Sequence, residues 1–473
     1  MINQTEKPLS LPDIDVDTIS SLDEAKLALR QILNFCETLL KERDQFLKEI
    51  SLLKQEIAQL KQQPRKPQFP QQQSFSATKL VKNKDKRWQK KARGTIEIDH
   101  YENLPEIDRC VCGSTDFKTM NTTTKVVQGL VIKRKNTAYH GRKKKCISCG
   151  RIYTTQIPRD IKGLSFDANT QTIASYLKFA CRFTHPLLYN FFTGFGIKIS
   201  YGELTEILHR NSGKLRPAYT HLRTVGVKQS SYLQSDATCS KRKQLATNKI
   251  INQHLHVVGN TFLSVFKITK LYNAGVMNNL LGKYGRKKLY VSDDASPNGK
   301  KLKITRKQLC WIHEDRHYLK LYPRLKMHKE KLQIVITQFL EFYHLAKAYG
   351  KNPTPEEKTK LRRIFDSITK QKTGYEALDK QLALTKRKRD RLLLFLDYPF
   401  IPIQNNQCEQ DLRDIVMIRN ISRETKSLAG DRSIERHMSI IQTAKKQGLN
   451  VFETLRGLLM GELPLSVLTT NFV

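Results

Sequence analysis

The stretch SYLQSDATCS (231–240) predicts a buried strand that ends in acid, and KKLYVSDDAS (287–296) repeats this pattern further along the chain. Between them, HLHVVGNTFLSVFKITK (254–270) predicts two strands joined at a Gly-Asn pair, a dipeptide typical of hairpin turns. AGVMNNLLGKYG (274–285) predicts a helix before the last strand. The sequence therefore predicts the order strand, strand, strand, helix, strand.

In this order, two carboxylates lie at strand ends: Asp236 at the end of the first strand and Asp293 at the end of the fourth. The order is that of a ribonuclease H-like α/β core, in which neighbouring strands bring two such side chains within reach of shared metal ions. NNQCEQDLRDIVMIRN (405–420) predicts a later helix that presents Glu409 as the third carboxylate. Carboxylates are hard oxygen donors, so this trio suits a pair of Mg²⁺ or Mn²⁺ ions. The alternative is that each acid is a turn former, a helix cap or a solvent-exposed side chain.

The charge of the chain favours a nucleic acid partner. Its 473 residues include 83 Lys and Arg against 44 Asp and Glu, a formal charge of +39. Phosphates that neutralise such a charge release counterions and bind without regard to sequence. A membrane surface is the competing partner, but the chain has no apolar run of about 18 residues. The N-terminal MINQTEKPLS is no secretory signal, so we expect a cytoplasmic protein.

Residues 22–62 predict one long helix with a coiled-coil seam. Two apolar series seven residues apart, one through Leu29 and one through Ile32, are offset by three, which is the a/d pattern. We therefore expect a homodimer or higher oligomer, and the alternative is an amphipathic helix docked on its own domain. Residues 63–96, rich in Gln, Pro and then Lys, predict a basic disordered linker.

Four cysteines in residues 97–160 predict a zinc ribbon. They form two knuckles, each followed by Gly for a tight turn, and the residues between them alternate like strands. The alternative is four unrelated structural cysteines. Basic side chains would give the ribbon a cationic face for DNA. The expected zinc ligands are Cys110, Cys112, Cys146 and Cys149, and the expected DNA contacts of the ribbon are Lys143, Lys144 and Lys145.

Residues 163–222 predict a helix-turn-helix domain that binds DNA. An apolar-periodic helix is expected to end at Gly194 or Gly196, and Ser200 is expected to cap a second helix with Glu203 at its third position. Any helical hairpin would have a similar pattern, so the position beside a zinc ribbon and a nuclease-like core favours the DNA-binding interpretation.

The catalytic core is expected to span 230–425, with a helical insertion at about 325–400 and C-terminal helices over 426–473. Cys310 and His313 lie three apart, which is the spacing of half a zinc site. Because no second ligand pair stands in register with them, we favour a packed structural role for this pair.

Several stretches together resemble the IS66 family of bacterial insertion-sequence transposases, which are DDE-type enzymes. The resemblance covers nearly all of the chain beyond the coiled coil, and its motifs keep the family's order. Besides the Cys knuckles, the stretches are 183–200, LQSDAT (233–238), LYVSDDA (289–295), QLCWIHEDRHYLKL (308–321), NNQCEQDLR (405–413) and 427–459.

The resemblance implies a multidomain α/β transposase whose catalytic, metal-binding carboxylates are Asp236, Asp293 and Glu409. It implies terminal inverted repeats and target DNA as partners, with Arg413 and Arg419 among the DNA contacts, and it is compatible with accessory proteins. A bacterial protein of this kind would be associated with the nucleoid when bound to DNA.

Two departures from the family bear on the site. Alanine at 237 stands where the family usually has Glu, and Asp294 stands where it usually has Gly after the second carboxylate, so Asp294 is an alternative to Asp293. Neither change removes an acid of the trio. The competing functions are a catalytically inactive, sequence-specific DNA-binding protein and a nuclease for RNA–DNA hybrids or Holliday junctions.

Overall fold

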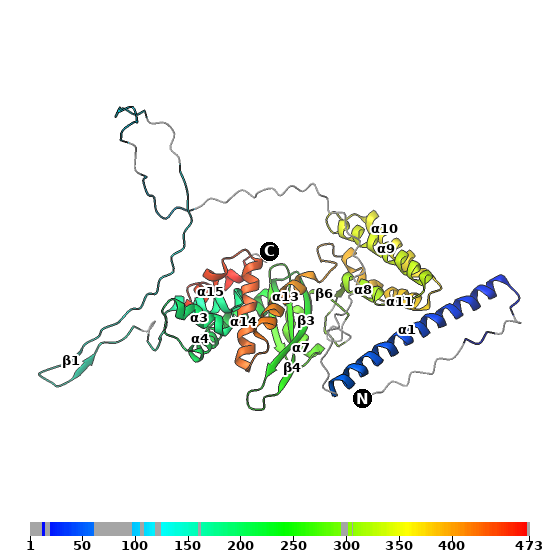
Figure 1. The fold of residues 1–473 in the computed structure, drawn as a ribbon, viewed down its shortest axis with the longest axis horizontal. Coiled ribbons are helices and arrows are strands. Elements are labelled where there is room, and N and C mark those ends of the chain that lie inside the picture. Colours follow the sequence, from blue (N-terminus) through cyan, green and yellow to red (C-terminus); the bar gives the residue numbers. More distant parts are fainter. Residues whose placement is uncertain are drawn as a thin grey trace. The chain divides into compact units, whose positions relative to one another are not determined.

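A computed structural model gives the fold (Figure 1). The described residues are 12–14, 19–60, 97–104, 108–118, 124–158, 162–294, 301–304 and 306–470. The predicted linker 63–96 lies outside them. The chain divides into two compact units, one of residues 1–44 with 133–473 and the other of residues 45–132. Each unit is described by itself below.

A five-stranded mixed sheet forms the centre of the larger unit, with strand order β5-β4-β3-β6-β7. Strands β3, β4 and β5 are antiparallel neighbours, whereas β6 and β7 run parallel to β3. The predicted order of three strands, a helix and a strand is confirmed, and β7 was not expected. The strands are Tyr232–Lys243 (β3), Ile250–Gly259 (β4), Ser264–Thr269 (β5), Leu289–Ser292 (β6) and Arg306–Leu309 (β7), and the helix is Ala274–Gly285 (α7).

The first strand is longer than predicted. Asp236 does not end β3, because pairing with β4 continues beyond it to Lys243. The parallel pairing with β6, however, stops at Gln234, two residues before Asp236. The carboxylate therefore lies where the sheet splits, with β3 still paired on one side and open on the other.

The predicted hairpin joins β4 and β5 through a short loop. Gly259 pairs with Ser264, and the side-chain Oδ1 of Asn260 accepts hydrogen bonds from the backbone N–H groups of Phe262 and Leu263. A Cβ atom at Gly259 would lie 2.1 Å from the carbonyl oxygen of Leu263, so this position requires glycine.

Helices α13 (Asn406–Ser422), α14 (Leu428–Lys446) and α15 (Val451–Met460) follow the sheet, and α14 covers its edge strand. Side chains of Glu435, Ser439 and Thr443 accept hydrogen bonds from three backbone N–H groups of β5. An edge strand otherwise exposes such groups to other chains. The C-terminal helices thus close the sheet, and a 3₁₀ turn at Leu465–Thr469 follows them.

The segment before the sheet is helical. Its elements are α2 (Ala168–Ser175), a π-helical turn (Tyr176–Ala180), α3 (His185–Gly194), α4 (Tyr201–Lys214), α5 (Arg216–His221), a second π-helical turn (Leu222–Gly226) and α6 (Val227–Gln229). Helix α3 ends at Gly194, and Ser200 and Glu203 form a reciprocal capping box at the start of α4. Both boundaries agree with the prediction.

A second hydrophobic core forms around Trp311 and also includes buried residues of β3, β6 and β7, whereas the first core contains the other sheet residues and the helices α2–α5. Five helices contribute to the second core, and they occupy the residues predicted for the insertion and the segment just before it. They are α8 (Trp311–Leu319), α9 (Lys326–Tyr349), α10 (Pro355–Lys370), α11 (Glu376–Arg387) and α12 (Arg389–Leu392), followed by a 3₁₀ turn at Leu394–Leu396.

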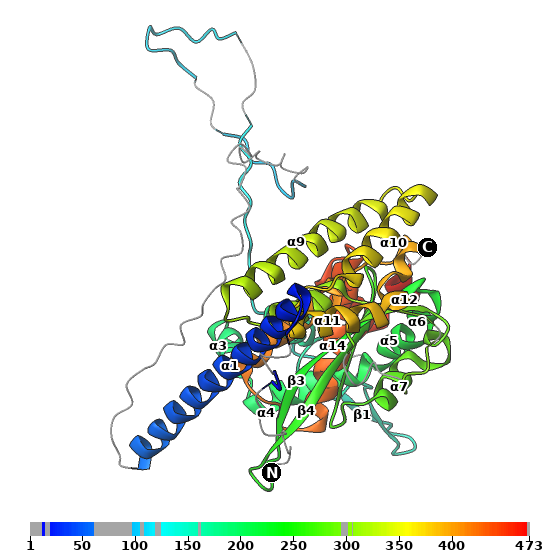
Figure 2. The same ribbon diagram turned by 90° about the vertical axis from the view of Figure 1, so that its right-hand side faces the viewer.

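Helix α1 (Leu22–Leu60) is continuous over 39 residues. Its part up to Asp44 belongs to the larger unit, and its ribbon is the blue helix in Figure 2. A buried carboxylate anchors this part. Glu37 is 3% exposed, accepts hydrogen bonds from the backbone N–H groups of Arg324 and Leu325, and contacts His328 at 3.2 Å. Seam residues such as Leu29 and Ile32 remain exposed. The helix is therefore docked on its own unit, as the alternative interpretation expected, but its apolar seam remains exposed. Self-association through this seam stays a prediction.

No helix among the described residues is long and apolar enough to cross a membrane.

Candidate active site

Asp236 lies in a pocket at the split of the sheet, among residues of β3, β4, α7 and the end of β6. The pocket is lined by Ser235, Asp236, Ala237, His256, Tyr272, Met277 and Asp293. Burial raises the pKa of the Asp236 carboxyl to about 7, against the hydrogen bond that its Oδ1 accepts from the Ala237 N–H at 2.8 Å. The negative charges of Asp293 and Glu409 raise the pKa further, and Arg316 lowers it. The two other carboxylates of the predicted trio therefore act on Asp236 directly.

Glu409 reaches this place because the start of α13 is tied to β3. The side-chain amide of Asn405 donates a hydrogen bond of 2.6 Å to the carbonyl of Ser235, the residue before Asp236. The backbone N–H of Asn405 donates to the sulfur of Cys310 at 3.2 Å. Asn405 is fully buried, so these bonds are shielded from water. They place Glu409, one turn into α13, beside the carboxylate of β3.

Asp293 follows β6 directly and is partly buried. Its negative charge acts to raise the pKa values of several groups around the site, including Asp236, Tyr272 and Lys307. Burial lowers the pKa of the β7 residue Lys307 to about 8, and the negative charge of Asp293 opposes that shift. Asp293 thus faces the same space as Asp236.

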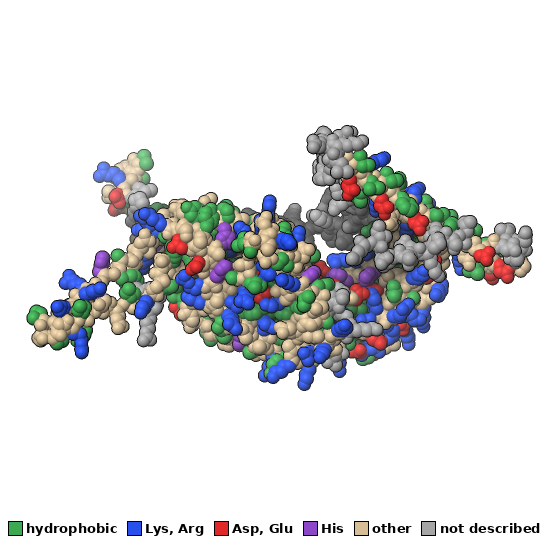
Figure 3. Space-filling view, turned by 90° about the horizontal axis from the view of Figure 1, so that it is seen from below, with side chains coloured by type: hydrophobic (Ala, Val, Ile, Leu, Met, Phe, Trp, Pro, Cys, Tyr) green, Lys and Arg blue, Asp and Glu red, His purple; other side chains and the backbone are tan. Residues whose placement is uncertain are grey.

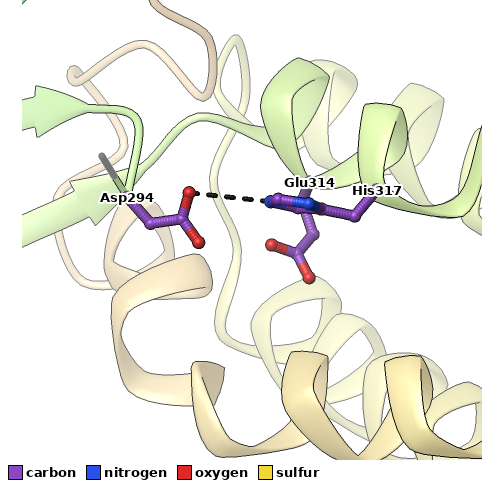
Figure 4. A group of neighbouring side chains, drawn as sticks. All are labelled: Asp294, Glu314 and His317. Atoms are coloured by element: carbon purple, nitrogen blue, oxygen red, sulfur yellow. Dashed lines mark ion pairs between the residues drawn. The ribbon is translucent and has the colours of Figure 1, made fainter. Parts of the chain in front are cut away.

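Asp294 has different partners. Its carboxylate accepts a hydrogen bond from the ammonium of Lys388 at 2.6 Å and lies 3.6 Å from His317 (Figure 4). Burial would raise the pKa of Asp294, but Lys388 and His317 hold it below its usual value. The adjacent acids therefore differ in surroundings, since Lys388 and His317 lie beside Asp294, whereas Asp293 raises the pKa of the Asp236 carboxyl.

Glu314 completes the group around Asp294. Glu314 and His317 project from α8 toward Asp294, as Figure 4 shows, and the three could hold a metal ion by their proximity. Glu314 is 3% exposed and accepts hydrogen bonds from Lys388 at 2.9 Å and from Thr385 at 2.6 Å. Because the Lys388 ammonium already contacts both carboxylates, it fills the role of the cation here.

Helix α8 also brings basic groups to Glu409. The Arg316 guanidinium lies 3.8 Å and the His313 ring 3.9 Å from the Glu409 carboxylate. Burial lowers the pKa of His313, with Asp293 and Glu409 acting in the opposite direction. Arg316 was not predicted as a site residue. In the sequence, only its position could have indicated it, because Arg316 lies one helical turn after His313 within the stretch that resembles the family.

Cys310 and His313 contact different neighbours. The Cys310 thiol is buried at the start of α8, where it accepts a backbone N–H from Asn405, and burial raises its pKa. His313 instead faces Arg316 and Glu409. These contacts favour the packed structural role for Cys310.

The two Cys knuckles fall in different units. In each, a backbone hydrogen bond closes the turn onto the first cysteine, and the following glycine has a positive φ, +91° at Gly113 and +71° at Gly150. The pKa values of Cys112 and Cys146 are lowered, in each case first by a hydrogen bond from a nearby backbone N–H. Such thiols suit a metal, and zinc stays a prediction.

The strands predicted between the knuckles are largely wrong. Among the described residues of 124–158, only β1 (Lys143–Lys145) and β2 (Ile152–Thr154) form, as a single antiparallel pair. Their side chains are exposed, so alternation alone buries no face that could stabilise longer strands. Lys143, Lys144 and Lys145 are consequently accessible.

Basic side chains are spread over the face of the molecule drawn in Figure 3. Of the predicted DNA contacts on α13, Arg413 is exposed and Arg419 is half-buried, with its guanidinium donating a hydrogen bond to the carbonyl of Cys239 on β3.

The sequence model of the transposase IS66 family matches residues 165–433, more than half of the chain. An uncharacterized protein of Sinorhizobium fredii is 34% identical over 165 residues, which are 35% of this chain and 50% of that protein. The chain thus spans about half the length of the curated relative that it matches. All three carboxylates lie inside the range matched by the family.

Proposed function

Because the chain belongs to the IS66 family of transposases, we propose that it is a DDE-type enzyme that cuts DNA at transposon ends and joins those ends to target DNA. The observation that carries the proposal is that Asp293 and the half-buried Asp236 line one pocket, and that Asn405 ties the start of the helix with Glu409 to the residue before Asp236. These acids come from two strands and a helix far apart in sequence. The sheet order, with β4 antiparallel and β6 parallel to β3, supports a ribonuclease H-like core.

The residues at this site fit a divalent metal. Burial and two like charges make an ionised Asp236 costly, and a bound cation would remove that cost. Asp236, Asp293 and Glu409 would hold Mg²⁺ or Mn²⁺ through carboxylate oxygens. When bound, such ions supply the Lewis acidity for in-line phosphodiester displacement.

The remaining side chains would orient the DNA. Arg316 lies beside Glu409 and would meet a phosphate that enters the site, because a guanidinium matches phosphate geometry. Asn405 would fix Glu409 relative to β3 through its bond to Ser235. No covalent intermediate with the protein is required, since the freed 3′-hydroxyl of DNA is the nucleophile of the joining step.

The other parts of the chain would find and hold DNA. We propose that the four knuckle cysteines bind zinc, that the ribbon and the α3–α4 helix-turn-helix contact the terminal repeats, and that the exposed seam of α1 pairs two copies. The enzyme would act in the cytoplasm of a bacterium, on the nucleoid.

The test uses the purified full chain and labelled duplexes carrying the inverted repeats that flank its gene. We expect strand cleavage at the repeat end and then joining to a second duplex, both dependent on Mg²⁺ or Mn²⁺. Specific binding of the repeats with no cleavage under any divalent ion would contradict the enzyme and favour the inactive DNA-binding protein. Cleavage of hybrids or four-way junctions, but not of repeat ends, would favour the junction nuclease.

A further inference from the structure

A large cavity lies between the helices α3 and α4, the far half of β3 and the segment that joins α13 to α14. Its volume is about 750 Å³, which is in the range of small-molecule sites. It belongs wholly to the larger unit, and it is separate from the small pocket around Asp236. None of the three carboxylates lines it.

The wall of the cavity is mostly apolar. Phe179, Leu208, Ile415 and Ile418 are buried hydrophobic residues of the core that also line the cavity. Tyr201 lies at the same cavity; the residue is 49% exposed, and its ring stacks on that of Tyr189 at a centroid distance of 4.5 Å. An aromatic ring held rigid by a neighbour, above an apolar wall, is the kind of surface on which a nucleobase stacks.

The polar part of the lining is cationic. Five Lys and Arg side chains contribute to it against a single acid, Glu424. None of the five forms an ion pair with a carboxylate among the residues that the structure describes. The five are Lys178, Lys241, Arg419, Arg423 and Lys426.

Lys178 is the unusual member of this set. It is 7% exposed, and its ammonium donates hydrogen bonds only to neutral oxygens, the carbonyl of Phe183 at 2.9 Å and the hydroxyl of Ser422 at 3.4 Å. Burial lowers its pKa to about 8. A buried cation without an anion is costly, and an anionic ligand in the cavity would offset that cost.

The cavity lies next to the carboxylates along two elements. Thr238 and Ser240 line it and alternate on β3 with the same phase as Asp236, so all three face one side of the sheet. Thr238 is about 7 Å along the strand from Asp236. Helix α13 carries Glu409 near its start and Arg419, at the cavity, near its end. Along β3, one nucleotide step could therefore span the distance from the cavity edge at Thr238 to Asp236.

We propose that this cavity binds an unpaired nucleotide of the DNA end, with the base on the apolar wall beside Tyr201 and its phosphate at Lys178 and Arg419. The inference rests on the proposed function, because it places the neighbouring phosphodiester at Asp236. A paired duplex offers phosphates to the cationic rim but no base to the apolar wall, so only an extruded or single-stranded nucleotide uses both.

The experiment compares two DNA probes on the full chain without added divalent cation, so that binding is measured without cleavage. One probe is a blunt repeat-end duplex, and the other carries a short unpaired tail with 2-aminopurine, whose fluorescence reports stacking. Lys178→Met removes the buried charge at nearly constant length, and Thr205→Trp fills the cavity from α4, where Thr205 is half-buried in its lining. Lys283→Met, on the exposed surface of α7, is the matched control for the lost charge.

We expect both cavity variants to weaken binding of the tailed probe about tenfold and of the blunt probe less than twofold, as for loss of one stacked base. The wild-type chain and Lys283→Met should change the 2-aminopurine signal, and Thr205→Trp should not. Equal losses for both probes, or no loss for the tailed probe with either variant, would overturn the proposal. Since these readouts need no cleavage, an inactive chain that still selects the tail would contradict only the proposed enzyme. A chain that cleaves but does not select the tail would contradict only the cavity.

Discussion

Two clusters of acids lie on either side of the end of β6, and they are arranged in opposite ways. In the first, Asp236 is surrounded by the like charges of Asp293 and Glu409, and its pKa is raised. In the second, Asp294 and Glu314 share the ammonium of Lys388, and the pKa of Asp294 is lowered. Adjacent residues of one loop thus contribute to a cluster in which like charges raise the pKa of Asp236 and to one whose acids share a lysine ammonium.

This difference separates a metal site from a structural contact. Among the described residues, proximity of possible ligand atoms marks the second cluster as a metal site and does not mark the first. Electrostatics argues the other way, because the Lys388 ammonium already neutralises the second cluster at 2.6 and 2.9 Å, whereas Arg316 lies 3.8 Å from Glu409 in the first. Since Lys388 follows α11, the second cluster joins the helical insertion to the loop that carries Asp293.

The largest expected effect comes from neutralising the first cluster. Asp236→Asn, Asp293→Asn and Glu409→Gln should each reduce Mg²⁺-dependent cleavage of repeat ends by about 1,000-fold or more, since one preorganised charge is worth roughly 10²–10³ in rate. End binding, measured by fluorescence anisotropy, should remain. Asp294→Asn is the matched control from the second cluster, with an expected loss of about tenfold or less. If Asp294→Asn abolishes cleavage and Asp293→Asn does not, the roles of the two residues are reversed.

Removing the cation of the second cluster should chiefly affect stability. Lys388→Met leaves the buried Glu314 without its charge partner, and we expect a loss of about 2–4 kcal/mol in the free energy of unfolding. Lys380→Met also removes one lysine charge, but from a side chain of α11 that is 72% exposed. We expect it to lower the free energy of unfolding by about 0.5 kcal/mol or less. Chemical denaturation measures both. An equal effect of the two variants would contradict the structural contact.

The contribution of Lys388 should also depend on pH in a defined direction. The pKa of Asp294 is lowered from 3.8, so its share of the stability is present above that pH and is lost as the pH falls below it. The pKa of Lys388 is raised from 10.5 by its two acidic partners, against the effect of burial, so its share is lost only as the pH rises above that value. The difference in unfolding free energy between wild type and Lys388→Met should therefore be constant from about pH 5 to pH 10.

Much of the first cluster could be predicted from the sequence, and the second could not. Asp236 and Asp293 each follow a short apolar run, and Glu409 lies in a periodic helix, so local patterns indicated these acids, and the resemblance to the family implied their roles. Lys388 lies in the basic run at 386–389, where four cations are indistinguishable until the fold buries one of them. The end of β3 was wrong for a related reason, because pairing with β4 extends a polar stretch that has no strand signal of its own.

Adding a divalent cation should distinguish the clusters without any DNA. At a concentration of Mg²⁺ or Mn²⁺ about 100 times its dissociation constant, binding to the folded chain alone stabilises it by about 2.7 kcal/mol. Asp236→Asn should abolish this stabilisation, and Asp294→Asn should not. The folded pKa of Asp236 is raised from 3.8 to about 7, so its ionisation reduces stability as the pH rises between these values, and the loss is complete above about pH 7. Metal-free Asp236→Asn should therefore be about 1–3 kcal/mol more stable than wild type at pH 8. Thermal unfolding with and without the cation measures both effects.

The smallest effect should come from the residue that positions Glu409 rather than from the acids themselves. Asn405→Ala removes the bond to the Ser235 carbonyl at a fully buried position, which should cost about 1–3 kcal/mol. Cleavage should fall about 10- to 100-fold, because Glu409 would lose its fixed distance from β3. Asn406→Ala is the matched control, since the adjacent Asn406 is exposed at the start of α13. If the rate falls because Glu409 is displaced, saturating Mn²⁺ should restore part of the activity of Asn405→Ala and none of that of Glu409→Gln. Equal rescue of both variants would mean that Glu409 does not hold the metal. Asp236 and Asp293 would then be the two metal ligands of the first cluster.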